Sequence, residues 1–365
     1  MDKKCKVLQV CHDLSPPFEL IVKSYAASFT DCDVLTIILK GSLNERFSES
    51  INGEVCFLSL PDTSLSGLKL RAIFKVGRLV KEFGPDLVIA HRYKPFFIVT
   101  MLNYLMSIPQ VLGVSHHYGF LKRRTRSLFS RFWKNNIDIV GISPPLCAHI
   151  KKGRSYLEKR VHLVQQASER TEQLDKGLAL RELGLPEGNY YYGTIGRLVE
   201  KKNHKLLLEA FSLFHDNSRL IIIGEGRLYD RLILQAERLG IAERLHLLGH
   251  IDVASKYLKA FDCFVFPSSA EEEFGVVLLE AMNSELPIVC SNAPGPSAIV
   301  DGVAQQFRSD DPEDLFLKMS EIRRKSDKDL RSAAQRGLRK LDTDFGHSKM
   351  ADSLRSLPPV LDALS

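Results

Sequence analysis

Several features that would define a protein class by themselves are absent from this sequence. No apolar run approaches the ~20 residues that a membrane-spanning helix needs. The chain also has no internal repeat and no tract of low complexity, and tryptophan occurs once in 365 residues. It enters a strand-like run almost at once, without the apolar segment of a secretion signal. We therefore expect a cytoplasmic protein that neither spans a membrane nor forms a repeat array.

Cysteine shows no pattern typical of a metal site or of a disulfide framework. The seven cysteines are odd in number, lie mostly within apolar runs and include no Cys-x-x-Cys pair. They are Cys5, Cys11, Cys32, Cys56, Cys147, Cys263 and Cys290. We expect them to be reduced residues of the core.

Strand-like apolar runs alternate with helical periodicity along the whole chain. The runs cover residues 6–10, 34–39, 87–90, 111–114 and 137–142 in the first half, and 191–195, 220–223, 245–247, 263–266 and 288–290 in the second. Such alternation is typical of parallel sheets covered by helices. A chain of 365 residues with 44% hydrophobic content can form two cores. The predicted fold class is α/β, with two doubly wound, Rossmann-like domains facing a central cleft.

Glu272 and Glu280 lie on either side of a predicted junction between a loop and a helix. If the helix begins near Phe274, its first amides and its dipole offer a site for phosphate. Glu280 would then lie roughly 9 Å beyond the first turn, so the two carboxylates could bind hydroxyls on both sides of that phosphate. A nucleotide sugar fits this arrangement. The alternative is that Glu273 and Glu280 are ordinary carboxylates of a helix start and a helix surface.

A second strand, basic turn and helix lies earlier in the same half. Gly196 and Arg197 follow the aromatic run 190–192, and Lys202 precedes the helical run 205–211. Arg197 can donate to two phosphate oxygens and Lys202 can add a positive charge, while Gly196 lets the backbone approach a ligand. The alternative is a solvated basic turn.

Together these motifs resemble the family 4 retaining glycosyltransferases of GT-B fold. The resemblance rests on the Gly196-Arg197-Leu198 turn with Lys202, the Gly224-Glu225-Gly226 turn after residues 220–223, the Leu248-Gly249-His250 turn, and Glu272 to Glu280 followed by Ala281 and Met282. The motifs cover most of the second half of the chain in the family's order and with its usual spacings. The first half resembles the family less.

The resemblance implies a role for each residue of these motifs. Arg197 and Lys202 would stabilise the departing diphosphate, where negative charge develops. Glu280 would bind the ribose and Glu272 the hydroxyls of the transferred sugar. The implied nucleotide contacts are Gly196, Gly226, Ile251, Phe274, Gly275, Val276 and Glu280. No carboxylate of the first domain stands out as a nucleophile, so a same-face displacement, in which the leaving phosphate receives the acceptor proton, is the expected route to retention.

The predicted domains follow from the strand pattern and the resemblance. The periodic pattern lapses between residues 164 and 188. We expect an N-terminal acceptor-side domain over residues 1–165 and a C-terminal nucleotide-sugar donor domain over residues 166–345. In the resembling fold the C-terminal helix crosses back to the first domain, and residues 346–365 are expected to do so here.

Histidines end two of the predicted strands of the first half, where doubly wound sheets bind their ligands. His116 and His117 follow the run 111–114, and His91 ends the run 87–90. In similar enzymes a histidine at this place lies near the anomeric centre of the donor. We prefer His116 for that role, with His117 second and His91 as a further candidate. The alternative for each is a structural histidine.

The first strand-to-helix turn departs from the family pattern. Relatives often carry a glycine pair there, whereas this chain has Pro16 and Pro17. Proline cannot donate an N–H group or reach positive φ. Ser15 is the candidate to replace these contacts with the acceptor.

Two Asp-x-Asp sequences match the pattern by which another glycosyltransferase fold binds a divalent ion. They are Asp31-Cys32-Asp33, before a strand, and Asp342-Thr343-Asp344, in the charged C-terminal region. Because Arg197 and Lys202 already supply positive charge to the leaving group, we expect no metal and no cofactor besides a UDP- or GDP-sugar donor. The turn at residues 224–226 lacks the third glycine of a dinucleotide fingerprint, which makes a nicotinamide dehydrogenase a poor alternative.

Positive charge is concentrated in the first predicted domain. Residues 1–165 contain 24 Lys and Arg against 13 Asp and Glu, a net charge of +11. The remaining residues contain 26 against 31, a net charge of −5. Much of the positive excess lies between Lys122 and Lys134, where apolar residues recur at near-helical spacing beside the cations. These apolar residues are Leu121, Leu128, Phe132 and Trp133.

This basic segment has two interpretations. It could be a helix whose apolar stripe packs on the core and whose basic face is solvated. It could instead dock on an anionic membrane surface or bind a phosphorylated acceptor. The arginines that would make such contacts are Arg123, Arg124 and Arg126.

The sequence thus predicts a retaining glycosyltransferase that moves a sugar from a nucleoside diphosphate sugar to a hydroxyl of a glycan or lipid-linked acceptor. Bacterial lipopolysaccharide core or an exopolysaccharide precursor is the expected acceptor, and a small soluble acceptor is the alternative. Peripheral contact with the inner face of the plasma membrane is one of the two interpretations of the basic segment, and nucleic-acid binding is not expected. The alternatives are a nucleotide-sugar epimerase of GT-B fold and a catalytically inactive homologue that binds nucleotide sugars.

Overall fold

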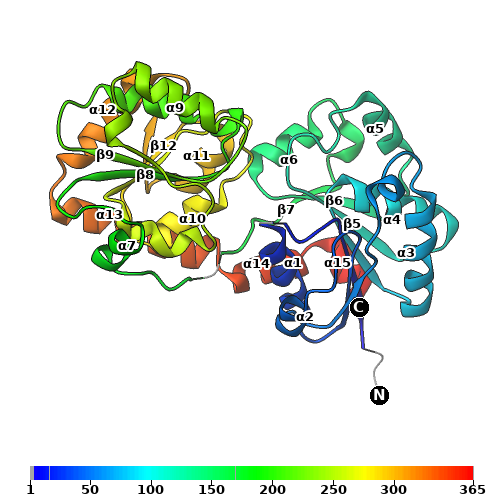
Figure 1. The fold of residues 1–365 in the computed structure, drawn as a ribbon. Coiled ribbons are helices and arrows are strands. Elements are labelled where there is room, and N and C mark those ends of the chain that lie inside the picture. Colours follow the sequence, from blue (N-terminus) through cyan, green and yellow to red (C-terminus); the bar gives the residue numbers. More distant parts are fainter. Residues whose placement is uncertain (1–3, 16, 169, 365) are drawn as a thin grey trace. The chain divides into compact units, whose positions relative to one another are not determined.

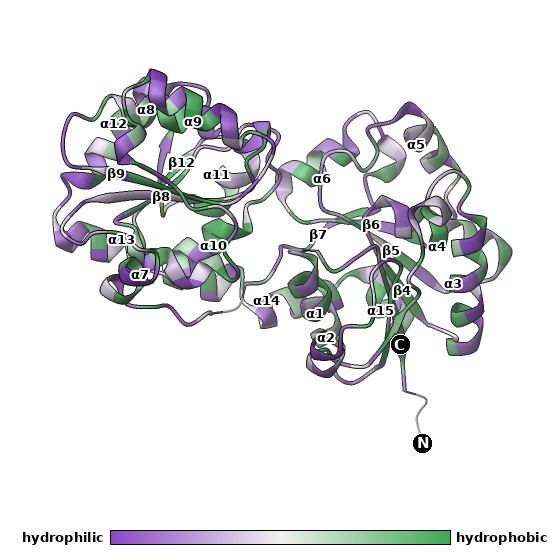
Figure 2. Ribbon diagram, viewed as in Figure 1, coloured by the Kyte–Doolittle hydropathy of each residue, from purple (hydrophilic) through white to green (hydrophobic). Residues whose placement is uncertain are grey.

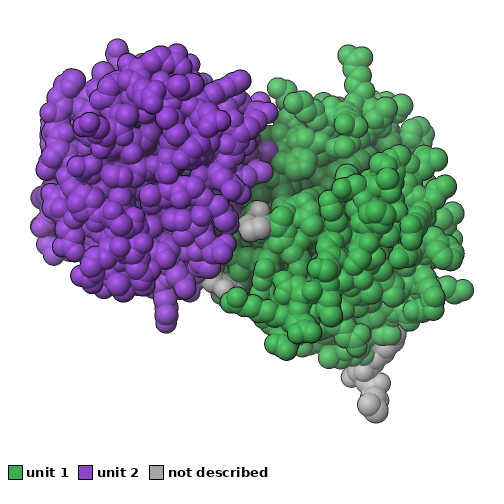
Figure 3. Space-filling model, viewed as in Figure 1, with its two compact units in different colours: residues 1–167, 346–365 green, residues 168–345 purple. Residues whose placement is uncertain are grey.

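The computed structural model describes residues 4–15, 17–168 and 170–364. Pro16, one of the two prolines of the first turn, lies outside the described residues. The chain divides into two compact units, shown in different colours in Figure 3. Unit 1 consists of residues 1–167 and 346–365, and unit 2 of residues 168–345. None of the described helices is long and apolar enough to cross a membrane.

Unit 1 is built on a seven-stranded parallel sheet with the order β3-β2-β1-β4-β5-β6-β7 (Figure 1). Its strands are β1 (Lys6–Cys11), β2 (Asp33–Ile38), β3 (Glu54–Phe57), β4 (Leu87–His91), β5 (Gln110–Ser115), β6 (Ile137–Gly141) and β7 (Val161–Leu163). Its helices are α1 (Phe18–Ala27), α2 (Glu45–Ser50), α3 (Leu70–Phe83), α4 (Tyr93–Leu105), α5 (Arg124–Phe129), α6 (Pro144–Lys151), α14 (His347–Arg355) and α15 (Pro358–Leu364). Short 3-10 turns cover Asp62–Leu65, Ser130–Phe132 and Ser155–Leu157.

Unit 2 is built on a six-stranded parallel sheet with the order β10-β9-β8-β11-β12-β13. Its strands are β8 (Tyr191–Ile195), β9 (Arg219–Ile223), β10 (Leu245–Leu247), β11 (Cys263–Phe266), β12 (Ile288–Ser291) and β13 (Gln305–Phe307). Its helices are α7 (Lys176–Glu182), α8 (His204–Ser212), α9 (Tyr229–Arg238), α10 (Val276–Asn283), α11 (Pro294–Val300), α12 (Pro312–Arg323) and α13 (Asp327–Asp344), with 3-10 turns at Glu200–Lys202, Ala242–Arg244 and Ala254–Ala260.

The prediction of two doubly wound parallel α/β domains is confirmed by these two sheets. All ten predicted strand runs coincide with strands, and β3, β7 and β13 were not predicted. Every residue of β4 and β5 is buried, as expected for strands covered by helices on both faces. Figure 2 shows hydrophobic residues along the sheets and both hydrophobic and hydrophilic residues on the helices that cover them.

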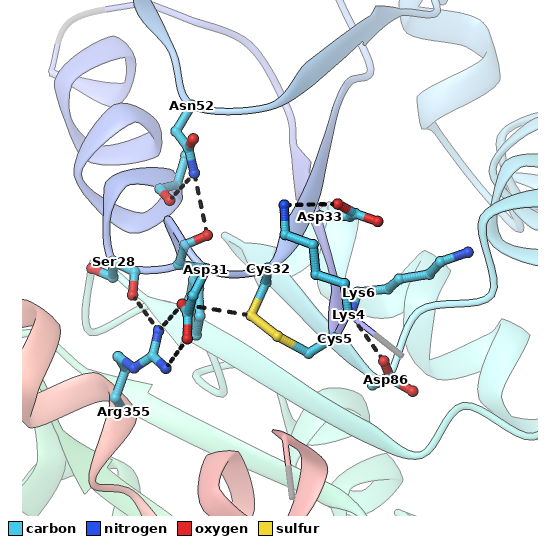
Figure 4. The surroundings of a disulfide bond; sticks show 12 residues. Lys4, Cys5, Lys6, Ser28, Asp31, Cys32, Asp33, Asn52, Asp86 and Arg355 are labelled. Atoms are coloured by element: carbon cyan, nitrogen blue, oxygen red, sulfur yellow. Dashed lines mark hydrogen bonds and ion pairs between the residues drawn. A yellow bond between two sulfur atoms is a disulfide. The ribbon is translucent and has the colours of Figure 1, made fainter. Parts of the chain in front are cut away.

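A disulfide joins the starts of two neighbouring strands in unit 1 (Figure 4). Cys5 immediately precedes β1 and Cys32 immediately precedes β2, and the two strands pair in parallel from Lys6 and Asp33 onward. This register holds the two Cα atoms 4.8 Å apart, within the range that a disulfide requires. The expectation that all cysteines are reduced is therefore wrong for this pair. The other five remain free.

The last two helices belong to unit 1, although they follow unit 2 in sequence. On α14, Arg355 donates to the Asp31 carboxylate at 2.7 Å and to the Ser28 carbonyl at 3.2 Å (Figure 4). Helix α15 lies against β4 and β5. These contacts cover one face of the unit 1 sheet with residues from the C-terminal end.

Candidate functional site

The strand order of unit 2 reverses between β8 and β11. Parallel α/β sheets bind ligands outside the carboxyl ends of the strands at such a reversal, because the loops that follow the two strands diverge there. The loop after β8 carries Gly196, Arg197 and the 3-10 turn Glu200–Lys202, and the loop after β11 carries Glu272 and Glu273. The predicted donor residues therefore gather at the place where this topology puts a ligand.

Backbone contacts with the next turn hold the loop after β8. The N–H of Gly196 donates to Ile223 O at 2.9 Å, and the N–H of Leu198 donates to Glu225 O at 2.8 Å. A Cβ atom on Gly224 would lie 2.1 Å from Gly196 O, and one on Gly226 would lie 2.5 Å from Leu198 O. Glycine is therefore required at residues 224 and 226 for this packing.

Gly196 itself is less constrained, since a Cβ atom there would meet only Lys202 at 3.5 Å. The adjacent Arg197 is exposed, and no hydrogen bond or ion pair of its guanidinium is found among the residues that the structure describes. The next residue, Leu198, is buried and anchors this loop in the core of unit 2. Arg197 thus has its positive charge available for a ligand.

Lysines of the first loop form ion pairs with the two glutamates of the second. Lys202 Nζ lies 2.6 Å from Glu272 Oε2, and Lys201 Nζ lies 3.3 Å from Glu272 Oε1 and 3.1 Å from Glu273 Oε2. Glu272 is only 6% exposed. The N–H of Ser269 also donates to Lys201 O at 2.8 Å. Sequence reasoning missed Lys201, because neighbouring lysines offer no signal of which one meets a partner 71 residues away.

These ion pairs set the protonation of the cluster. Burial alone would raise the pKa of the Glu272 carboxyl, but the charges of Lys202 and Lys201 hold that pKa below its ordinary value. Burial alone would lower the pKa of Lys201, but Glu272 and Glu273 raise it. Glu272 is therefore an anion and an acceptor of hydrogen bonds at neutral pH.

Helix α10 begins at Val276, two residues later than the sequence suggested. Gly275 precedes it in the left-handed region at φ 104°, and a Cβ atom there would lie 2.9 Å from the Phe266 ring. Phe274 is 3% exposed and packs against Phe345 at a centroid distance of 6.0 Å. The expectation of a helix start near Phe274 is therefore corrected, because that side chain anchors the loop in the core before the helix begins.

Glu280 lies one turn into α10 and is half-buried. Burial raises the pKa of its carboxyl to about 7. No hydrogen bond or ion pair of this carboxyl is found in the described part of the chain. The turn after β10 lies near the same edge, since the N–H of Gly224 donates to Gly249 O at 2.7 Å, and the half-buried Ile251 follows it. A half-buried carboxyl without a partner among the described residues is suited to accept hydroxyl groups of a ligand.

Unit 1 carries a separate cluster at the carboxyl ends of its own strands. His91, the last residue of β4, is fully buried, and its Nε2 lies 3.1 Å from Gln9 Oε1. Its Nδ1 lies 3.4 Å from Nε2 of His116, which follows β5. The Nδ1 atom of His116 is buried without a hydrogen-bond partner in the described residues. His117 is half-buried.

Both histidines of this pair are neutral at physiological pH. Burial, with a contribution from Arg92, lowers the pKa of His91 to about 3. Burial and the neighbouring His91 lower the pKa of His116 well below its ordinary value. His116 can thus donate or accept one hydrogen bond at the unpartnered Nδ1, but it does not carry positive charge.

The turn after β1 meets the end of β4 where the strand order of unit 1 reverses. Asp13 accepts from Arg92 Nη1 at 2.9 Å and from the Ser15 N–H at 3.0 Å, and it pairs with His12 Nδ1 at 2.6 Å. The Ser15 hydroxyl also donates to Asp13. Arg92, at φ 69°, stacks 3.3 Å from the centre of the Phe18 ring. Sequence reasoning missed His12, Asp13 and Arg92, although each follows a strand that borders the reversal.

Burial alone would raise the pKa of the Asp13 carboxyl, but hydrogen bonds from Ser15 and His12 and the charge of Arg92 hold that pKa well below its ordinary value. Asp13 is therefore an anion whose oxygens are already engaged. It is placed to orient Ser15 and not to act as a free nucleophile.

The basic segment is not one amphipathic helix. Helix α5 spans six residues and is followed by the 3-10 turn Ser130–Phe132. Leu121 and Trp133 are buried, whereas Leu128 is 58% exposed and Phe132 is 68% exposed. The interpretation of a helix with its whole apolar stripe on the core is therefore wrong, because the segment turns too soon for the stripe to stay on one face.

The three arginines of this segment differ in their surroundings. Arg123 and Arg124 are exposed. Arg126 is half-buried, donates to Gly119 O at 3.1 Å and lies 3.8 Å from the centre of the Tyr93 ring. Arg126 thus stabilises the loop before α5, which leaves the other two available to solvent.

In each of the two Asp-x-Asp sequences, one aspartate forms an ion pair with an arginine. Asp31 pairs with Arg355, and Asp342 pairs with Arg170 at 2.6 Å. Within the described residues, no group of three or more His, Cys, Asp or Glu side chains is arranged to hold a metal ion.

Comparison with known proteins gives consistent similarities. Residues 175–336 match the family described as glycosyl transferases group 1. The chain is 34% identical over 245 residues to the N-acetylgalactosamine-N,N'-diacetylbacillosaminyl-diphospho-undecaprenol 4-alpha-N-acetylgalactosaminyltransferase of Campylobacter jejuni, covering 65% of this chain and 63% of that protein. This match therefore spans less than two thirds of the relative's length.

Two further similarities extend over more of the chain. The lipopolysaccharide core biosynthesis glycosyltransferase LpsD of Rhizobium meliloti is 23% identical over 295 residues, which is 80% of each protein. The crystal structure of Anabaena Alr3699/HepE in complex with UDP-glucose superposes with a TM-score of 0.79 at 20% identity, covering 96% of this chain and all of that one. At this identity the structural likeness supports the fold alone.

Proposed function

Since the chain belongs to the group 1 glycosyl transferases and has their GT-B fold, we propose that it moves a sugar from a nucleoside diphosphate sugar to a hydroxyl of a glycan acceptor, with retention of configuration. The observation that carries this proposal is the meeting of Lys202 and Glu272 at the strand reversal of unit 2, at 2.6 Å. A cation and an anion at this place can bind the leaving group and the sugar of one donor.

Lys202 and Arg197 are proposed to bind the departing diphosphate. In the structure Lys202 is neutralised by Glu272, while Arg197 is exposed and without a partner among the described residues. A diphosphate carries more negative charge than one carboxylate, so it would compete for Lys202. Lys201 would then remain to keep Glu272 anionic. The start of α10 at Val276, with Gly275 in the left-handed region, would direct backbone amides toward the same anion.

Glu272 and Glu280 are proposed to bind hydroxyl groups on the two sides of the diphosphate. Glu272 would accept from the transferred sugar once Lys202 turns to phosphate. Glu280 would accept from the ribose, which would satisfy a carboxyl for which the described residues provide no hydrogen-bond partner. Gly196, Gly226 and Ile251 remain the predicted contacts with the rest of the nucleotide.

In unit 1, His116 is proposed to position the transferred sugar through a hydrogen bond at Nδ1, the buried atom that lacks a partner in the described residues. Because burial keeps this imidazole neutral, its contribution would be orientation and not charge. His117 and His91 are secondary candidates, and Ser15, oriented by Asp13, is the candidate contact with the acceptor.

The proposed mechanism is a same-face displacement. Asp13, the carboxylate at the strand reversal of unit 1, is held by Arg92, His12 and Ser15, which argues against a covalent glycosyl intermediate on it. The leaving phosphate would accept the proton of the acceptor hydroxyl as the new glycosidic bond forms. The charges developing on that phosphate are what Arg197 and Lys202 would stabilise.

We propose a lipid-linked or phosphorylated glycan as the acceptor, such as a precursor of lipopolysaccharide core or exopolysaccharide. This agrees with the positive charge of unit 1 and with the diphospho-undecaprenol substrate named for the Campylobacter relative. The enzyme would act in the cytoplasm at the inner face of the plasma membrane.

One assay tests this function. The purified chain is incubated with UDP- and GDP-sugars, with and without a lipid-linked acceptor, and free nucleoside diphosphate is measured. A transferase should release it in proportion to glycosylated acceptor. Conversion of the donor to another nucleotide sugar would identify an epimerase, and binding without turnover for every donor would identify an inactive homologue.

A further inference from the structure

Large apolar side chains are exposed just before α3 and in its first turns. Leu68 is 71% exposed, Leu70 is 69% exposed and Phe74 is 77% exposed. Leu70 and Phe74 are four residues apart on α3 and therefore share one face of it. The core-facing side of α3 carries Val76 and Val80, which are buried in unit 1. With 3.6 residues per turn, Leu70 and Phe74 lie beside that buried side and extend its apolar surface toward solvent. We call Leu68, Leu70 and Phe74 the apolar ridge.

Large apolar side chains that are exposed beside the buried side of a helix indicate a surface that covers something besides its own core. The core-facing side of α3 packs on α4, where a Cβ atom on Gly77 would lie 2.8 Å from Leu102. This contact accounts for the buried face and leaves the ridge without a function inside unit 1. Figure 2 shows hydrophobic and hydrophilic residues interleaved along α3.

Basic residues are interspersed with the residues of the apolar ridge. Lys69 and Arg71 alternate with the leucines, and Lys75 follows Phe74. No ion pair of these three side chains is found in the described part of the chain. The core of a protein–protein interface is depleted of charge, whereas alternating leucines and unpaired cations are typical of surfaces that meet anionic lipid headgroups. This pattern favours a lipid surface over a second protein.

The net charge of the whole region points the same way. Residues 63–134 contain 13 Lys and Arg and two Asp and Glu, a net charge of +11. The other residues of 1–165 contain 11 of each sign. The entire positive excess of this part of the chain therefore lies in the segment that contains α3, α4 and α5.

Aromatic contacts join the ridge to the basic segment around α5. Lys69 Nζ lies 4.8 Å from the centre of the Phe97 ring on α4, and Phe97 lies 5.9 Å from Phe129 of α5. The exposed Leu128 is next to Phe129, and Phe132 follows in the 3-10 turn. The start of α3 and the end of α5 thus meet the same side of α4.

A shallow pocket of about 400 Å³ lies beside the ridge, lined by side chains between Thr63 and Arg71 that include Ser64, Ser66 and Lys69. Burial, with the charges of Lys94 and Arg126, lowers the pKa of Lys69. A hydroxyl-lined pocket with a cation that no carboxylate of the described residues neutralises can hold a phosphate group.

From these observations we propose that unit 1 docks on an anionic phospholipid bilayer through the apolar ridge. Leu68, Leu70 and Phe74 would enter the boundary between headgroups and acyl chains, while the cations beside them contact lipid phosphates. Leu128 and Phe132 would form a second, weaker contact on the same side of α4. This docking involves none of the residues proposed for sugar transfer. An experiment can therefore contradict the docking without contradicting that function.

The test uses full-length protein and sedimentation with vesicles of phosphatidylcholine, with or without phosphatidylglycerol. Wild type should bind the anionic vesicles, and salt should weaken binding. The triple variant Leu68→Ser, Leu70→Ser, Phe74→Ser should bind about tenfold more weakly. The matched control, Leu234→Ser with Leu317→Ser, replaces leucines of unit 2 that are 52% and 48% exposed and should bind like wild type.

A second measurement tests insertion without removing the ridge. Because the one natural tryptophan, Trp133, is buried, the substitution Phe74→Trp adds an exposed reporter. Its emission should shift to shorter wavelength with anionic vesicles and be quenched by brominated lipid. Unchanged binding of the triple variant, or an unshifted reporter on bound protein, would overturn the proposal. Self-association that the triple variant abolishes, without vesicle binding by wild type, would instead assign the ridge to a second copy.

Discussion

Lys202 Nζ lies 2.6 Å from the carboxylate of Glu272, across the strand reversal of unit 2. The sequence assigns these residues to different parts of a donor, the diphosphate and the sugar. The ion pair shows that the two side chains adjoin. The proposed binding of a donor requires an exchange, in which the diphosphate takes the cation and the freed carboxylate takes the hydroxyls, with Lys201 remaining beside Glu272 at 3.3 Å.

Donor binding should depend on the ionisation of Glu280. Its pKa in the fold, about 7, is above its ordinary value of 4.5. The fold accommodates the protonated carboxyl better than the buried carboxylate. The stability that this gives the fold is fully present below the ordinary pKa and is lost as pH rises through about 7. Ribose hydroxyls that donate to the carboxylate would offset this loss. Affinity for UDP should therefore rise about tenfold between roughly pH 6 and pH 8.

Calorimetric titration of UDP over this range measures the effect. The phosphate of UDP also titrates, so the comparison is with Glu280→Gln, which keeps the shape and removes the ionisation. The difference between the two profiles should follow a group with a pKa near 7. Parallel profiles for both proteins would remove Glu280 from the ribose site.

Much of the fold could be predicted from the sequence. The three strands that the sequence did not predict have one physical cause in common. The missed strands β3, β7 and β13 are edges of their sheets. Each has three or four residues, at most one of them buried. A continuous apolar run arises only where helices cover both faces of a strand, so these three gave no such signal.

Parts of the site depend on contacts between residues distant in sequence. Glycines, lysines and glutamates at family spacings predicted the loops after β8 and β11. The partnership of Lys201 with Glu273, 72 residues apart, and that of Arg92 with Asp13, 79 residues apart, arise only when the strand order is known. Local pattern could not reveal them.

His116 should affect transfer more than donor binding. Replacement with Ala removes the unpartnered Nδ1 proposed to position the sugar, and turnover should fall about 100-fold while affinity for UDP stays unchanged. Because burial keeps the imidazole neutral, the pH profile of wild-type turnover should show no histidine titration near pH 6.5. The control is His215→Ala, an exposed histidine of unit 2. Loss of UDP binding in the His116 variant would instead indicate a structural role.

Turnover should survive exhaustive chelation with EDTA. Arg197 and Lys202 are proposed to supply the positive charge that a divalent ion would otherwise bring to the diphosphate. The assay compares nucleoside diphosphate release before and after chelation, followed by addition of Mg²⁺ or Mn²⁺. Activity that is lost and then restored by one of these ions would overturn the metal-independent mechanism.

The disulfide between Cys5 and Cys32 should be measurable chemically. Thiol titration of the denatured, unreduced protein should count five thiols, and seven after reduction. Replacing both residues with Ser should lower the free energy of unfolding by about 2–4 kcal/mol, because the link constrains the unfolded chain. Seven thiols without reduction would restore the expectation drawn from the sequence.

The central claim is that Arg197 and Lys202 stabilise a departing diphosphate. Its most direct test is the turnover of Arg197→Ala and Lys202→Ala, measured as nucleoside diphosphate release with acceptor present. The matched control is Lys205→Ala, an exposed lysine in the first turn of α8 that pairs with Glu209 at 3.7 Å. Each of the first two variants should lose at least about 100-fold in turnover, and the control should match wild type. Near-normal turnover in both Arg197→Ala and Lys202→Ala would contradict the account.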